Sequence, residues 1–233
     1  MIAIDADTWP IILLSIKIAC TAVILMLPVA FGLAWLLARH DFPGKLLVDA
    51  LVHLPLVVPP VVTGWLLLIL FAPAGPVGGF LADRLGIILL FRWTGATLAA
   101  AIMAMPLMVR AMRLSIEAID PRLEQAARTL GAAPLRLFLT ISLPLTLPGI
   151  AAAIVLGFAR SIGEFGATIT FVSDVPGETR TLPIAIYAAL QQPGAERTVL
   201  TLSLLSILLS LGALMGSEII VRKTRRQRIA HVL

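Results

Sequence analysis

A group of polar residues stands inside an otherwise apolar segment, GFARSIGEFGATITF, in the second half of the chain. At helical spacing Gly157, Ser161, Glu164 and Thr168 fall on one stripe, and Arg160 stands one turn before Glu164, where opposite charges attract. Arg160 could bind an anion there, so Arg160, Ser161, Glu164 and Thr168 are a candidate translocation path. Alternatively, Arg160 and Glu164 only neutralise each other while the glycines allow helices to pack closely. The residues by themselves leave both interpretations open.

Patterns typical of enzymes and metal sites are missing from the sequence. It contains no H-E-x-x-H, no G-x-S-x-G and no Cys/His cluster, since His40, His53 and His231 are far apart and Cys20 is single. It also lacks G-x-x-x-x-G-K-[ST], the loop that cradles the phosphates of ATP. We therefore expect no catalytic residue, no metal and no cofactor on this chain. If ATP drives its activity, a separate subunit must hydrolyse the ATP.

The composition of the chain indicates that the polar group around Arg160 and Glu164 lies in a membrane protein. The chain is 59% hydrophobic and 13% charged, whereas soluble domains are roughly 25% charged. A span needs about 20 apolar residues. We predict an all-α, multi-pass membrane protein of five to six helices, forming a single transmembrane domain over residues 1–233, with apolar windows at about 11–38, 48–72, 87–109, 145–171 and 199–221. Residues 181–192 are too short for a span and predict an interfacial or re-entrant outer helix.

The basic residues predict the orientation of the spans, because Lys and Arg are retained on the cytoplasmic side. Twelve of the 18 basic residues fall in the loops on one side of the predicted spans and in the carboxyl-terminal tail. Four fall in the loops on the other side. This asymmetry places the N-terminus outside and the C-terminus inside. The basic residues lie beside spans without interleaved aromatic residues, so they indicate contact with lipid headgroups and no nucleic acid.

Prolines recur inside the predicted spans. A proline removes an amide donor and clashes with the preceding turn, so it kinks a helix. We take Pro55, Pro59, Pro60 and Pro106 as candidate hinges of a pore-forming unit. The alternative is that proline is simply commoner in membrane helices than in soluble ones.

The connection between the third and fourth spans is the only long one on the predicted cytoplasmic side. Asp120 is a good N-cap, Pro121 suits the first helical position and Gly131 is typical of a helix end, so a short helix is predicted between them. Its small exposed residues suit insertion into a cleft of another protein. An amphipathic helix on the membrane surface is the alternative.

The same segment resembles a known family. QAARTLG, followed after nine residues by ISLP, is similar to the EAA loop of ABC importer permeases, although Gln125 replaces the usual first Glu and Glu124 stands one place earlier. In that family the loop forms the coupling helix that docks on the ATPase subunit. The resemblance therefore implies that the residues coupling this chain to an ATPase are Glu124, Gln125, Ala126, Ala127, Leu130, Gly131, Ile141, Leu143 and Pro144.

Further segments extend the resemblance over most of the chain. HLPLVVPPVVTGWLLL, MPLMVRAMRLSIE and FARSIGEFGATITFVSDVPGETRTLPIAIY resemble the molybdate permeases among the binding-protein-dependent importers, with sulfate permeases as the nearest relatives. This implies the type I importer fold, a homodimer in the bacterial cytoplasmic (inner) membrane, two ATPase subunits that bind ATP and Mg, and an external oxyanion-binding protein. It also implies import of molybdate or a similar tetrahedral oxyanion by alternating access, coupled through the 121–131 helix.

Other functions stay open at this point. An ion-coupled secondary transporter of small anions could use Arg160 and Glu164 at broken helices. Such transporters usually have two related halves, and no internal repeat stands out in the sequence. A sulfate or tungstate permease and a purely structural membrane subunit are lesser alternatives, and an intramembrane enzyme is the poorest.

Overall fold

The computed structural model describes the backbone of residues 8–230 and, in the last helix, the side chains up to Gly212 together with Met215. Helices are the only regular structure within these residues. In chain order the elements are α1 (Thr8–Arg39), α2 (Lys45–Val57), α3 (Pro60–Phe71), α4 (Pro76–Leu85), α5 (Trp93–Glu117), α6 (Pro121–Thr129), α7 (Pro134–Leu137), a π-helical turn (Phe138–Ser142), α8 (Leu143–Ile162), α9 (Gly166–Val172), α10 (Leu182–Leu190) and α11 (Glu196–Ala230). The all-α prediction is confirmed.

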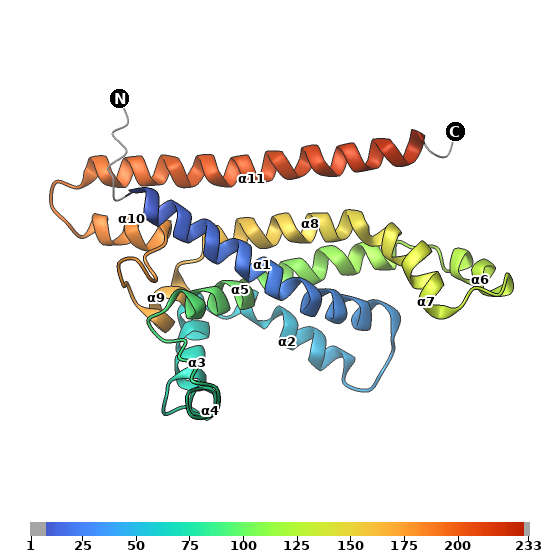
Figure 1. Cartoon of the computed structure of the whole chain (residues 1–233), viewed down its shortest axis with the longest axis horizontal. Helices are drawn as coiled ribbons and strands as arrows, with labels where there is room; N and C mark the ends of the chain where they lie inside the picture. The colour runs from blue at the N-terminus through green and yellow to red at the C-terminus, as the bar shows by residue number, and fades with distance from the viewer. Residues whose placement is uncertain (1–7, 231–233) are drawn as a thin grey trace.

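The long helices lie roughly side by side, and the short helices gather at the two ends (Figure 1). α1, α5 and α8 pack on one another, and α11 packs on α8 and α10. α6 and α7 lie at one end of this bundle, and α3, α4, α9 and α10 lie at the other. α1 begins at the second end and α11 finishes at the first, so the described chain starts and stops at opposite ends.

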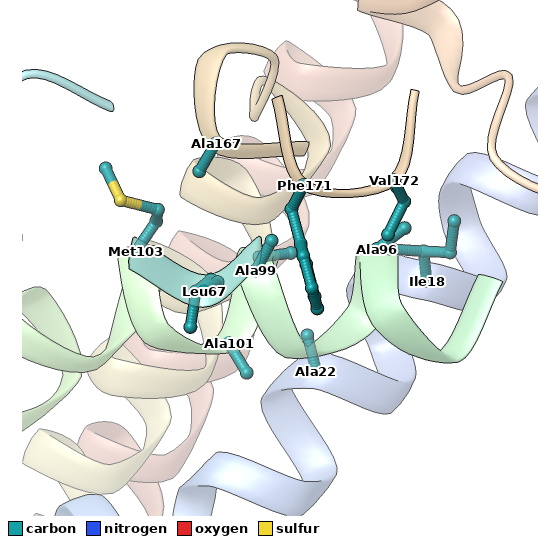
Figure 2. Packing of buried hydrophobic residues seen from close by; sticks show 11 residues of the cluster. Ile18, Ala22, Leu67, Ala96, Ala99, Ala101, Met103, Ala167, Phe171 and Val172 are labelled. Carbon is teal, nitrogen blue, oxygen red and sulfur yellow. The ribbon is translucent and has the colours of Figure 1, made fainter. Parts of the chain in front are cut away.

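Alanines on α5 allow this close packing. Ala96, Ala99 and Ala104 are fully buried, and a methyl side chain lets neighbouring helix backbones approach closely. Figure 2 shows Phe171 of α9 lying against α5 near Ala96 and Ala99, with Ala22 of α1 beyond the end of the ring. The core thus combines small residues, which bring the helices close together, with larger side chains such as Met103 of α5 and Phe171 of α9.

The predicted spans agree with the structure in part. Among the described residues, α1, α5 and the run Pro134–Ile162 are each long and apolar enough to cross a membrane. The pair α2 and α3 adds a fourth if it counts as one bent span. The predicted span 199–221 falls in α11, where most side chains after Gly212 lie outside the described residues. The total of five to six spans and their orientation stay predictions.

The predicted span 48–72 is not one straight helix. α2 and α3 meet at an angle of 114°. Val58 and Pro59 both have extended backbones, with ψ of 137° and 135°, because a proline disfavours the helical conformation in the residue before it. The consecutive prolines Pro59 and Pro60 therefore break the helix. The other two candidate hinges, Pro55 and Pro106, are buried within α2 and α5, and both helices continue past them.

The predicted span 145–171 needs a larger correction. The helical run starts earlier, at Pro134, and passes through the π-helical turn into α8, which ends at Ile162. A short break then precedes α9. Thr168 therefore lies on a different helix from Ser161, and the polar stripe expected on one helix is divided between two.

The two broken segments pack against each other. A Cβ atom on Gly64 of α3 would lie 2.5 Å from the carbonyl oxygen of Ala167 in α9. A Cβ atom on Gly166 would lie 2.7 Å from Cβ of Pro60. Glycine at both positions allows the backbones of α3 and α9 to approach more closely than any side chain would permit. The helix breaks thus bring together two segments that are far apart in the sequence.

Candidate functional site

The short helix predicted in the long connection is present as α6. Asp120 precedes it, and the Asp120 carboxylate accepts a hydrogen bond from the backbone N–H of Arg122 at 2.9 Å. Pro121 occupies the first turn, as predicted. Gly131 has φ of +79°, a left-handed conformation that glycine adopts without strain. Asp120, Pro121 and Gly131 therefore predicted both ends of this helix correctly.

α6 projects from the bundle with an exposed apolar surface. It has no buried residue. Leu123 in α6 is 49% exposed, Leu130 directly after it is 88% exposed, and Leu135 in α7 is 69% exposed. Gln125 and Ala126 are exposed as well. Apolar side chains that gather at one tip of a chain favour a protein-binding surface, although a membrane-surface helix would also expose them.

Glu124 is half-buried and bonded to other parts of the chain. Its carboxylate oxygen Oε1 lies 2.8 Å from Nη2 of Arg39, at the end of α1. The same oxygen accepts a hydrogen bond from the Ser142 hydroxyl at 3.0 Å. Glu124 therefore ties α6 to α1 and to the π-helical turn. Neither contact was predicted from the sequence, because Arg39 and Glu124 are 85 positions apart and nothing in a local pattern pairs residues so distant.

The predicted coupling residues divide into two groups. Gln125, Ala126, Leu130 and Gly131 are exposed. The half-buried members are Glu124, Ala127, Ile141, Leu143 and Pro144. The first group can meet a partner, and the second holds the segment in place.

The candidate path residues lie close together but are mostly buried. Glu164 is 3% exposed, and both of its carboxylate oxygens are engaged: Oε2 lies 2.6 Å from Nη1 of Arg160, and Oε1 accepts the Ala167 backbone N–H at 2.8 Å. Glu164 thus joins the end of α8 to the start of α9. Ser161 and Thr168 are buried, and the Ser161 hydroxyl has no hydrogen-bond partner among the described residues. Of the four, Arg160 alone is appreciably exposed, with 24% of its side chain accessible.

A second charged cluster, not singled out from the sequence, joins α2 to α5. Arg113 contacts Asp49 of α2 at 2.9 Å and Glu117 of its own helix at 2.7 Å. The ring nitrogen Nδ1 of His53 lies 2.9 Å from the carbonyl oxygen of Asp49. These groups line a shallow pocket together with Arg110. The ion pair between Arg113 and Asp49 fixes α2, the first helix of the bent pair, against α5.

At the opposite end, the loop after α9 is cross-linked by polar contacts. Arg180 donates two hydrogen bonds to the carboxylate of Asp174, at 2.7 and 2.8 Å, and these bonds raise the pKa of Arg180 above its usual value. Glu178 of the same loop accepts a hydrogen bond from the backbone N–H of Trp93, at the start of α5, at 3.3 Å. These contacts tie the loop to its own backbone segment and to α5. Lys17 of α1 also contacts the start of α5, because it lies 3.6 Å above the ring of Trp93 in a cation–π contact.

Among the side chains that the structure describes, no three from His, Cys, Asp or Glu are grouped so that they could hold a metal ion.

Comparisons with known proteins agree on one family. The family model described as binding-protein-dependent transport system inner membrane component matches residues 10–226. The molybdenum transport system permease protein ModB of Escherichia coli strain K12 is 54% identical over 97% of this chain and 99% of its own length. ModB of Haemophilus influenzae is 51% identical over 92% of this chain and 93% of its own. The sulfate transport system permease protein CysT of Salmonella typhimurium is 39% identical over 70% of this chain and 59% of its own.

Solved structures show the same fold. A bacterial ABC transporter that imports the acidic polysaccharide alginate has a chain with a TM-score of 0.74 and 19% identity, covering 94% of this chain and 80% of that one. The inward-facing methionine ABC transporter MetNI has a chain with a TM-score of 0.68 and 17% identity, covering 94% of each.

Proposed function

Since the chain belongs to the binding-protein-dependent transport system inner membrane components, and is an ABC importer permease, we propose that it carries molybdate or a similar tetrahedral oxyanion into the cell. The observation that carries this proposal is the 54% identity to the ModB permease of Escherichia coli over 97% of the chain. Sulfate is the second candidate substrate, because the sulfate permease CysT is 39% identical over a shorter part of the chain. Tungstate, an oxyanion of the same shape, is a third.

The permease works as a homodimer in the bacterial inner membrane, with the N-terminus outside and the C-terminus inside. Two ATPase subunits that bind ATP and Mg meet it at the α6 end, and an external oxyanion-binding protein meets it at the other end. Two observations support this arrangement. The exposed apolar residues of α6 lie at one end of the bundle. A solved alginate transporter of the same fold is in complex with a substrate-bound periplasmic protein.

ATP provides the driving force through the partner subunits. ATP binding closes the ATPase dimer and draws the two 121–131 helices together, which opens the permease outward. Hydrolysis returns it to the inward-open state, so the anion meets the path from alternate sides. The ATPase must bind the two states with different affinity, because only a difference in affinity can shift their populations. The breaks between α2 and α3 and between α8 and α9 are natural places for the chain to bend.

A reconstituted system tests the proposal. The permease is placed in lipid vesicles with its ATPase, and the binding protein is added with molybdate, tungstate or sulfate. We expect molybdate to stimulate ATP hydrolysis and ATP to drive uptake of the anion. Uptake driven by a proton or sodium gradient without ATP would instead support an ion-coupled secondary transporter.

The coupling surface has a test of its own in Ala126→Trp. Ala126 is exposed on α6, so tryptophan fits the free permease but obstructs a cleft that receives the helix. We expect molybdate-stimulated ATP hydrolysis to fall by about tenfold or more, the change produced by about 1.4 kcal/mol of lost coupling. Ala126→Ser is the matched control, since serine is small and leaves this exposed position of α6 able to enter the cleft. Equal hydrolysis in both variants would mean that α6 does not dock on the ATPase.

A further inference from the structure

The end of α1 and the start of α8 form one packed unit. The ring of Trp35 meets the ring of Phe138, in the π-helical turn, edge to face, with centroids 5.1 Å apart. Phe31 packs against both rings. One turn beyond Trp35, Arg39 places its guanidinium 5.6 Å from the Trp35 ring. The aromatic side chains therefore fix where the Arg39 side chain can point.

α6 is attached to this unit by charge. It has no buried residue of its own, so apolar packing holds it weakly. Glu124 lies between Arg39 and Ser142 with one oxygen within 3.0 Å of both. The side chains of Arg39 and Glu124 are 19% and 16% exposed, so their attraction is screened less than that of a surface pair.

The position of the Arg39 side chain is not explained by hydrogen bonding alone. The Nε atom of Arg39 is buried and has no hydrogen-bond partner among the described residues, which is a costly state for a charged group. Below Arg39, Leu37 and Ala34 are fully buried in the same core as Met112 and Ile116 of α5. A displacement of the Arg39 end of α1 must therefore reach α5.

We propose that Arg39, Glu124 and Ser142 are positioning residues that pass the movement of α6 to α1, in addition to the direct path from α6 through α7 into α8. The inference rests on the proposed function, because it assumes that an ATPase moves α6. It adds the specific contact through which that movement reaches the first helix. Glu124 acts within the permease, and Gln125, which occupies the place of the family's usual acid, is the residue free to face the partner.

Two measurements test the link, and the first needs no transport. Arg122 is an exposed residue of α6 outside the predicted coupling residues. A spin label on the cysteine of Arg122→Cys, after Cys20 is changed to serine, reports the mobility of α6 in the permease–ATPase complex. Glu124→Gln and Arg39→Gln are each expected to increase this mobility. Lys45→Gln is the matched control, because it removes an exposed ion pair with Asp41 just after α1 and leaves α6 untouched. Equal mobility in all variants would overturn the link even if the complex transports normally.

The second measurement is the number of anions imported per ATP hydrolysed. We expect each single variant to lower this ratio about tenfold. The exchange Arg39→Glu with Glu124→Arg restores the pair in reverse and is expected to recover most of the ratio, which simple misfolding would not allow. Normal ratios in the single variants, or no recovery in the exchange, would overturn the proposal. A wild-type complex that hydrolyses ATP but imports no anion would contradict the proposed function. The mobility of the spin label would still test the contact between α6 and α1.

Discussion

Glu164→Ala is expected to destabilise the permease by about 3 kcal/mol. The substitution removes a 3% exposed carboxylate and leaves Arg160 without its ion pair and the Ala167 N–H without its acceptor. Breaking a buried pair costs about 3–5 kcal/mol, and the lower value applies because a quarter of the Arg160 side chain is accessible. The shift in thermal unfolding of the detergent-solubilised protein measures the loss. Asp83→Ala, which removes an exposed carboxylate, should change stability by less than about 0.5 kcal/mol.

Arg160→Gln separates the two interpretations of this pair. If Arg160 contacts the transported anion, the variant assembles with its ATPase but imports the oxyanion slowly. If Arg160 only balances Glu164, uptake per assembled complex is unchanged. Both carboxylate oxygens of Glu164 are engaged in structural contacts, so anion binding is tested at Arg160, and the path role of the other residues stays a prediction. Uptake assays on complexes of equal purity decide the question.

Gly64→Ala is expected to cost about 2 kcal/mol, because the added Cβ atom would lie 2.5 Å from the Ala167 carbonyl oxygen. The neighbour is backbone, so it cannot rotate away, and α3 and α9 must separate. Gly32→Ala is the matched control: Gly32 also lies in a helix, but its Cβ would meet nothing within 4 Å. Helix propensity then makes alanine better by roughly 0.5–1 kcal/mol. The same substitution should thus shift the unfolding temperature in opposite directions, and equal shifts would contradict the close contact of α3 with α9.

Features that depend on neighbouring residues were predictable from the sequence. The ends of α6 follow from Asp120, Pro121 and Gly131, each of which acts within one turn. The break after Val58 follows from two consecutive prolines. The apolar run of α1 follows from composition alone.

The division of residues 145–171 was not predictable from periodicity. Polar and apolar residues continue at helical spacing through Gly163 and Phe165, so the sequence favours one helix. The structure ends α8 at Ile162 because Glu164 turns back to pair with Arg160 and to accept the Ala167 N–H. Each of these contacts joins residues that are close in the sequence. Periodicity nevertheless does not distinguish a carboxylate that accepts a backbone hydrogen bond from one that faces a pore.

The sequence by itself determined that this protein is a helical membrane permease with a short capped helix between Pro121 and Gly131, because composition, caps and the spacing of a short motif are local properties. Only the tertiary structure decided what the charged residues contact. Arg39 and Glu124 are 85 positions apart, and Gly64 meets Ala167 only after both helices have broken. Such pairs form because α1, α5 and α8 pack around small residues, and the register of that packing is set by the whole core rather than by any one segment.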